Sequence, residues 1–226
     1  MKKLTFIFLL SLLVCSNLLA QVSIGIKAGG ALSSHTSEDI GMGDGDFIKP
    51  TYLGGLFVNV PLASNLSVQS EVLYANKGYQ SKVTPRGSFT PRYHLHYISI
   101  PIMLQYQVVN RLTVELGPEL GYLLGTGSNI NSSGFGSFSS EFPSFHEQLE
   151  ASYRDLDIAV NIGVGYAFSD RWTLNLRYNM GLRDITDDFE VFFRSTNEPG
   201  SEVESTLYSF PRYNRSLQLS IGYRLF

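Results

Sequence analysis

Several features that common protein classes need are missing from this chain of 226 residues. Its one cysteine, Cys15, lies near the N-terminus, so the rest of the chain can form no disulfide and offers no thiolate to a metal. Beyond that N-terminal segment, no apolar run reaches the length of about 20 residues that a membrane-spanning helix needs. The net charge at pH 7 is -3, which argues against nucleic acid as a partner.

The N-terminal segment has the three parts of a secretory signal peptide. Two lysines precede an unbroken apolar run, and polar residues then lead to a small residue at Ala20. We therefore expect residues 1–20 to be a cleaved signal peptide and residues 21–226 to form one mature domain. Cys15 would be discarded with the peptide rather than carry a lipid, because Val14 stands before it where lipid attachment expects a small residue.

Alternation of apolar and polar residues is the strongest pattern in the remaining chain. The stretch DIAVNIGVGYAF at 157–168 places Ile, Val, Tyr and Phe at every second position and Asp, Ala, Asn and Gly between them. A period of two predicts strands with one apolar and one polar face. No segment has a convincing helical period, and eight segments alternate: 22–32, 51–60, 66–78, 93–108, 112–124, 154–168, 172–182 and 213–226.

Short and long connections alternate between these segments. Tight connections with turn residues lie at 61–65, 109–111 and 169–171. An up-and-down antiparallel sheet then has its tight turns at one end and its long loops at the other, as outer-membrane barrels do. The sequence therefore predicts an all-β fold, an eight-stranded antiparallel up-and-down transmembrane β-barrel. The predicted long loops are 33–50, 79–92, 125–153 and 183–212.

A soluble barrel of the lipocalin kind is the alternative, with its apolar face turned inward. The alternating segments have about the 9–11 residues that a tilted strand needs to cross a bilayer. Aromatic residues also lie near the ends of the apolar face, as interface girdles require. We therefore expect the apolar face to contact lipid. The predicted interface aromatics are Tyr74, Tyr106, Tyr122, Tyr166, Trp172 and Tyr223.

Charges of both signs lie on the polar face of the predicted strands. Their side chains would all point into the lumen, where they could meet in one layer. An eight-stranded barrel is just wide enough for its own side chains, and buried charges in such a space must be paired. The prediction is a packed ionic plug, which argues against a wide porin; a gate that opens to pass ions is the alternative. The predicted lumenal charge cluster is Lys27, Glu71, Glu115, Glu119 and Arg177.

The segment 93–108 has two further features. Pro101 lies on its inward face, and because proline cannot donate to the ladder, we expect a local bulge or a carbonyl satisfied by lumenal water. His94 and His96 share a face, two residues apart, which suits a metal pair on a strand. Without a cysteine or a carboxylate that can be placed beside them, interfacial rings are the simpler interpretation. We predict no metal and no cofactor.

The chain contains the stretches VSIGIKAGGALS at 22–33, LSVQSEVLYANKGYQ at 66–80, YISIPIMLQYQV at 97–108 and SIGYRLF at 220–226. These four stretches resemble the PorT-like outer-membrane beta-barrel family, which is common in Bacteroidetes. The resemblance implies an eight-stranded outer-membrane protein. It fixes no activity, because most members have none assigned, although one branch serves a machinery that secretes proteins. At Ser99 many relatives have an acidic residue, so an ion pair there is absent from this chain.

These patterns together predict an integral outer-membrane protein with a structural or interaction role, long extracellular loops, and both termini in the periplasm. Its expected partners are outer-membrane lipid, lipopolysaccharide and, during biogenesis, the barrel-assembly machinery. A component of a protein secretion assembly remains an alternative, as does a lipid-acting barrel enzyme. We expect the protein to have no enzymatic activity, because the serines and His146 of 125–153 form no recognisable catalytic motif.

Overall fold

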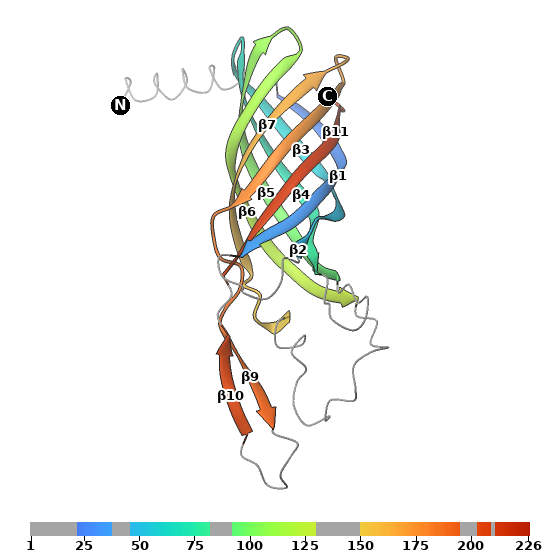
Figure 1. Cartoon of the computed structure of the whole chain (residues 1–226). Helices are drawn as coiled ribbons and strands as arrows, with labels where there is room; N and C mark the ends of the chain where they lie inside the picture. Colours follow the sequence, from blue (N-terminus) through green and yellow to red (C-terminus); the bar gives the residue numbers. More distant parts are fainter. Residues whose placement is uncertain (1–21, 38–45, 82–91, 130–149, 195–202, 209–210) are drawn as a thin grey trace, which may run out of the picture.

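The computed structural model describes residues 22–37, 46–81, 92–129, 150–194, 203–208 and 211–226. Eight long antiparallel strands form a barrel (Figure 1), which confirms the predicted fold class. Within the described residues, no helix is both long and apolar enough to span a membrane. The strands of the barrel are β1 (Ser23–Ser37), β3 (Lys49–Ala63), β4 (Leu66–Ser81), β5 (Arg92–Val109), β6 (Leu112–Asn129), β7 (Leu156–Ala167), β8 (Trp172–Gly181) and β11 (Arg212–Arg224).

The barrel closes because each long strand pairs with two neighbours. Around the wall the order is β4, β3, β1, β11, β8, β7, β6 and β5, and β5 pairs again with β4. The first and last strands are therefore adjacent, with Gly25 opposite Arg224 at one end and Ser37 opposite Arg212 at the other. A closed barrel pairs its backbone groups within the sheet, as a lipid environment requires.

Tight turns and long connections lie at opposite ends of the barrel. The turns that join β3 to β4, β5 to β6 and β7 to β8 share one end with the C-terminus, and we call it the short-turn end (Figure 1). The opposite ends of the strands, between which the longer connections run, form the loop end. There, β2 (Asp46–Phe47) pairs with β4. Beyond it, β9 (Phe189–Arg194) and β10 (Val203–Tyr208) form a separate hairpin (Figure 1).

Side chains alternate between the lumen and the outer surface along the long strands. On β8, for example, Arg177 and Asn179 are buried, whereas Leu176 and Tyr178 beside them are exposed. Polar residues thus line the inside and apolar residues cover the outside, the reverse of a soluble barrel. The lipocalin-like alternative is therefore wrong, and the apolar outer wall is what contact with lipid needs.

Pro101 is buried in the lumen and interrupts the ladder without a bulge. The register between β4 and β5 is the same on both sides of the proline, and only the pairing of residues 71–72 with 100–101 is lost. The bulge expected at Pro101 is therefore wrong. The register shifts between β5 and β6 fall at His96/Tyr97 and Gln107/Val109 instead. A missing N–H is accommodated here by a local loss of pairing rather than by an extra residue.

Candidate functional site

Four charged side chains meet in the middle of the lumen, one from every second strand around the barrel. Lys27 comes from β1, Glu71 from β4, Glu115 from β6 and Arg177 from β8, and each is almost fully buried. Arg177 donates to both oxygens of Glu71, at 3.0 and 3.1 Å, and its Nε donates to Glu115 Oε1 at 2.9 Å. Lys27 Nζ donates to Glu71 Oε1 as well. We call these four residues the Arg177 layer.

The Arg177 layer is electrically balanced, with two cations against two carboxylates. Amide side chains add to its hydrogen bonds: Gln69 Nε2 donates to Glu71 Oε1 at 2.6 Å, and Gln105 Nε2 donates to Glu115 Oε2 at 3.1 Å. Buried charges are tolerated when each has an opposite partner and further hydrogen bonds. The layer therefore closes the lumen with a bonded ionic network.

A second charged group, the Lys77 layer, lies nearer the loop end. Lys77 Nζ donates to Glu119 Oε1 at 3.0 Å and to Asp157 Oδ2 at 2.9 Å. Asn161 donates to Glu119 and Asn214 donates to Asp157, both at 2.9 Å. These five residues come from β4, β6, β7 and β11, so the layer connects four of the eight strands of the wall.

The predicted single layer of five charges is thus divided between two layers. The structure brings Lys27, Glu71, Glu115 and Arg177 together and places Glu119 with other partners. The reason is geometric: Glu119 is two inward positions beyond Glu115 on β6, a rise of roughly 13 Å along the strand. Lys77 and Asp157 were missed as members of the cluster, although their inward parity was visible in the sequence.

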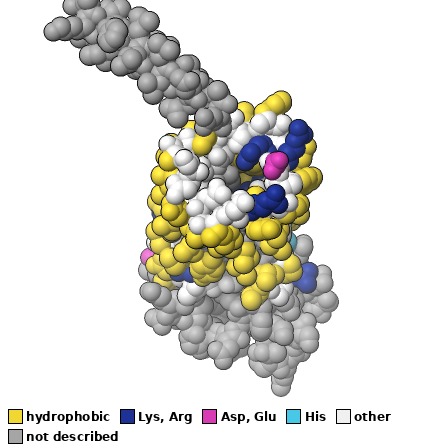
Figure 2. Space-filling model, turned by 90° about the horizontal axis from the view of Figure 1, so that it is seen from above, with side chains coloured by type: hydrophobic (Ala, Val, Ile, Leu, Met, Phe, Trp, Pro, Cys, Tyr) yellow, Lys and Arg dark blue, Asp and Glu magenta, His cyan; other side chains and the backbone are white. Residues whose placement is uncertain are grey.

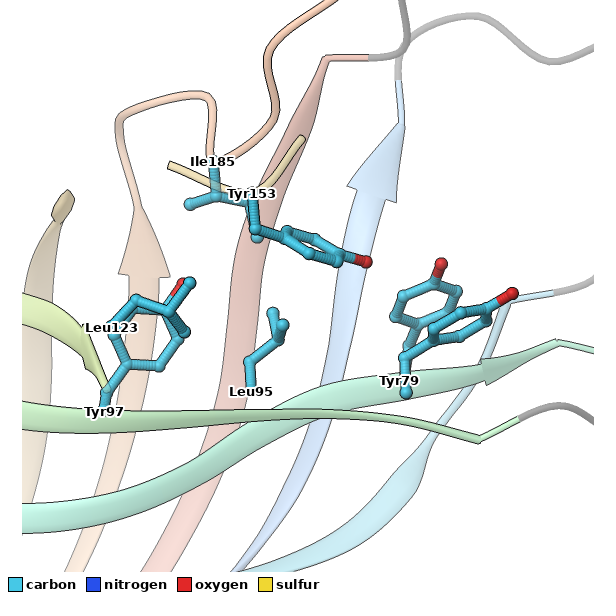
Figure 3. Close-up of a cluster of buried hydrophobic side chains, with 7 residues drawn as sticks. Tyr79, Leu95, Tyr97, Leu123, Tyr153 and Ile185 are labelled. Atoms are coloured by element: carbon cyan, nitrogen blue, oxygen red, sulfur yellow. The ribbon is translucent and has the colours of Figure 1, made fainter. Parts of the chain in front are cut away.

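An aromatic and apolar cap closes the lumen beyond the Lys77 layer (Figure 3). Tyr79 stacks on Tyr93 with ring centroids 4.6 Å apart, and Arg212 donates to the Tyr79 hydroxyl at 2.8 Å. Two members of the cap belong to connections rather than to strands, so the chain folds back into the barrel mouth. The cap consists of Tyr79, Tyr93, Leu95, Tyr97, Leu123, Tyr153 and Ile185.

The short-turn end is open by comparison. A cavity of about 550 Å³ begins at this end and reaches inward as far as Lys27 and Gln69. Figure 2 looks onto this end, where charged side chains gather at the mouth and hydrophobic ones surround it. We call this cavity the vestibule, and it ends where the Arg177 layer begins. Polar side chains that line it include Asn59, Ser67, Gln105, Thr113, Thr173 and Asn175.

All six predicted interface aromatics point outward, where they form two groups. Tyr106, Tyr166, Trp172 and Tyr223 lie near the short-turn end, and the rings of Trp172 and Tyr223 are 4.6 Å apart. Tyr74 and Tyr122 lie toward the loop end, and both are register partners of Ile98 on the strand between them. Two levels of outward aromatics with apolar residues between them are the arrangement of membrane girdles.

His94 and His96 also lie on the outer surface, at the loop end of β5. Their rings are nearly parallel, with centroids 6.3 Å apart. Within the described part of the chain, no three His, Cys, Asp or Glu side chains are grouped closely enough to hold a metal ion. The neighbours of this pair are instead Lys49, Tyr74 and Asn76.

Comparisons with known proteins give one family match. A family model described as "Outer membrane protein beta-barrel domain" matches residues 16–187. No curated protein matches the chain. Among solved structures, Neisserial surface protein A is 13% identical, with a TM-score of 0.48, over 89% of this chain and 97% of that one. Ail of Yersinia pestis is 10% identical, with a TM-score of 0.44, over 90% and 98%. A major outer membrane protein of Thermus thermophilus is 9% identical, with a TM-score of 0.45, over 91% and 100%.

Proposed function

Because this chain belongs to the outer membrane protein beta-barrel domain family, we propose that it is an outer-membrane barrel with a sealed lumen and a structural or interaction role. In this proposal it has no catalytic activity and conducts no large solutes. The proposal rests on three groups of packed side chains that follow one another along the barrel axis: the Arg177 layer, the Lys77 layer and the aromatic cap. A wide channel would need a lumen free of such packed, bonded groups.

The proposal also includes an orientation. The three tight turns lie with the first and last residues of the barrel, and the longer connections lie at the opposite end. Barrels of the outer membrane have short periplasmic turns and longer extracellular loops. The short-turn end, with both ends of the mature barrel and the vestibule, would then face the periplasm. The β9–β10 hairpin would stand at the cell surface, where it is available to partners (Figure 1).

Planar-bilayer recording tests the sealed lumen. The purified barrel should give only small or rare conductance steps. A matched variant, Lys27→Ala with Glu71→Ala, removes one cation and one carboxylate of the Arg177 layer and so leaves the net charge unchanged. Its conductance should also stay small, because the Lys77 layer and the aromatic cap still close the lumen beyond the emptied space. Steady large channels from the unmodified barrel would contradict the proposal.

The finer assignment to the PorT-like family, and with it a place in a protein secretion assembly, is the second candidate. It is supported by the stretches quoted above, such as YISIPIMLQYQV at 97–108. Crosslinking in intact outer membranes followed by purification distinguishes the two roles. Recovery of secretion proteins would favour the assembly, whereas recovery of the barrel alone would favour an independent role.

A further inference from the structure

The vestibule at the short-turn end has the size of a ligand site. Its volume of about 550 Å³ lies within the range of roughly 300–1,000 Å³ that small-molecule sites occupy. It is open at the mouth and reaches inward to Lys27 and Gln69, both of which bond to the Arg177 layer. The cavity is therefore a pocket that a ligand would enter from the short-turn end.

Three arginines stand at the mouth of the vestibule, where Figure 2 shows cationic side chains gathered. Arg111 lies in the turn between β5 and β6, Arg171 in the turn between β7 and β8, and Arg224 at the end of β11. All three are exposed. Backbone hydrogen bonds of 2.8 Å join these segments, because Ala167 N donates to the Arg111 carbonyl oxygen and Arg224 N donates to that of Arg171. The three arginines therefore follow one another along one side of the mouth.

These arginines leave positive charge available to a ligand. Asp170 is the one acidic side chain among the described residues that line the vestibule. In the described part of the chain, no carboxylate side chain forms an ion pair with Arg111, Arg171 or Arg224. Arg111 and Arg171 donate instead to neutral oxygens of the protein, at 3.4 and 3.2 Å. Guanidinium groups bind the oxygens of carboxylates and phosphates, so the mouth suits an acidic group.

Asn175 points to a ligand independently, because it is a buried amide without a partner. It comes from β8, is 4% exposed and lines the vestibule. Among the described residues its amide has no hydrogen-bond partner. A Cβ at Gly165 on the neighbouring strand would lie 2.8 Å from Asn175 Nδ2, so the glycine leaves room for this amide. Buried amides need hydrogen bonds, and those of Asn175 can come from what enters the vestibule.

The rest of the wall carries further groups that donate and accept hydrogen bonds. Asn59 Nδ2 donates to Gln105 Oε1 at 2.8 Å and to Ser67 Oγ at 3.1 Å, which holds these three side chains side by side. Thr113 and Thr173 add two hydroxyl groups to the lining. Sugar hydroxyls also donate and accept, so amide and hydroxyl side chains are suitable partners for them.

We propose that the vestibule binds a small acidic sugar of one or two rings. Its acidic group pairs with the three arginines at the mouth, and its hydroxyls bond to Asn175 and to the other amides and hydroxyls of the wall. A nucleotide suits the site less, because the described residues of the lining include no Tyr or Trp on which a base would stack. An acidic peptide also suits it less, because a closed barrel has no free strand edge to pair with the peptide backbone. The proposal adds a ligand to the role proposed above and holds for either orientation of the barrel.

Calorimetric titration of the barrel in lauryldimethylamine oxide micelles, which contain neither sugar nor acid, tests the proposal. The probe is digalacturonic acid, a disaccharide with a carboxylate on each ring. Galactobiose has the same rings without the carboxylates, glutarate has carboxylates without rings, and triglutamate is an acidic peptide. Digalacturonic acid should bind, and each of these three controls should bind at least about tenfold more weakly. Equally tight binding of any one of the three would overturn the proposal.

Variants locate the bound sugar. Asn175→Leu keeps a side chain of similar size without the amide, and Arg171→Gln removes one guanidinium group. Each should weaken the binding of digalacturonic acid about tenfold. Arg92→Gln removes an exposed cation at the loop end and should leave the affinity unchanged. An equal loss in Arg92→Gln would mean that nonspecific charge attracts the sugar, and unchanged affinity in Asn175→Leu or Arg171→Gln would mean that it binds elsewhere; either result would overturn the proposal. Native heat-modifiable migration on a gel shows that each variant is folded.

Discussion

Arg177 and Glu71 join opposite walls of the barrel through two parallel hydrogen bonds of 3.0 and 3.1 Å. Their strands, β8 and β4, are separated by three strands in either direction around the wall. The pair therefore spans the diameter of the lumen. Lys27 on β1 bonds to the Glu71 end of this pair, and Glu115 on β6 bonds to the Arg177 end, so one bonded chain connects four evenly spaced strands.

Removal of Arg177 should destabilise the barrel strongly. Arg177→Met leaves Glu71 and Glu115 with one cation of the layer, Lys27, and an unpaired buried carboxylate costs about 3–5 kcal/mol. Urea unfolding in lipid bilayers measures the change. Arg224→Met is the control, because that side chain is exposed and outside the charged layers. Similar losses of stability in the two variants would show that the Arg177 layer does not hold the barrel together.

The two carboxylates of this layer should differ in importance. Glu71 accepts hydrogen bonds from Lys27, from Gln69 and twice from Arg177. Glu115 accepts one from Arg177 and one from Gln105. Glu71→Gln should therefore lower the urea midpoint more than Glu115→Gln, since it weakens more charge-assisted bonds. The reverse order would mean that these hydrogen bonds do not govern stability.

Space for the layer depends on Gly163 of β7. A Cβ at this position would lie 2.9 Å from Glu115 Oε1 and 2.6 Å from the Leu176 carbonyl oxygen. Gly163→Ala should thus displace the carboxylate from Arg177 and cost about 1–3 kcal/mol, as overpacking does. Gly125→Ala is the matched control, because nothing lies within 4 Å of a Cβ there. Equal urea midpoints for the two variants would contradict the close approach.

The class of fold was predictable because the alternation of inward and outward side chains along a strand is visible within each short segment of sequence. The segment expected at 172–182 agrees with β8 (Trp172–Gly181), and the one at 112–124 lies within β6 (Leu112–Asn129). Strands β1 and β6 extend furthest beyond their expected ends, and both do so toward the loop end. Gly, Ser and Thr there replace the alternating apolar residues that lipid contact requires. The strands continue to pair in these extensions without apolar alternation, so no periodic pattern in the sequence predicts them.

The partners inside the lumen were less predictable than its residue types. Inward parity identified Glu119 but not its height relative to Arg177, because height depends on the stagger between strands. The stagger is set by pairing such as Gly163 opposite Arg177, which the sequence does not specify. The aromatic cap was missed for another reason: Tyr153 and Ile185 are in connections, where no period exists to show which side chains turn inward.

Single cysteines can test both the seal and the orientation. The only cysteine of the chain, Cys15, lies in the predicted signal peptide, so an introduced cysteine would be the only thiol of the mature protein. Thr173→Cys places it in the vestibule, and Asn161→Cys places it behind the Arg177 layer at a position with no exposed surface. In the purified, folded barrel a small maleimide should label Thr173→Cys rapidly and Asn161→Cys only after heat unfolding.

The same two variants in cells report on direction. A maleimide that cannot cross the outer membrane should leave Thr173→Cys unlabelled on intact cells and label it once the outer membrane is permeabilised, because the vestibule would open to the periplasm. Asn161→Cys should resist the reagent in both conditions, since the Arg177 layer blocks one approach and the aromatic cap the other. Labelling of Thr173→Cys on intact cells would reverse the orientation. Labelling of Asn161→Cys in the folded barrel would instead show that the lumen opens.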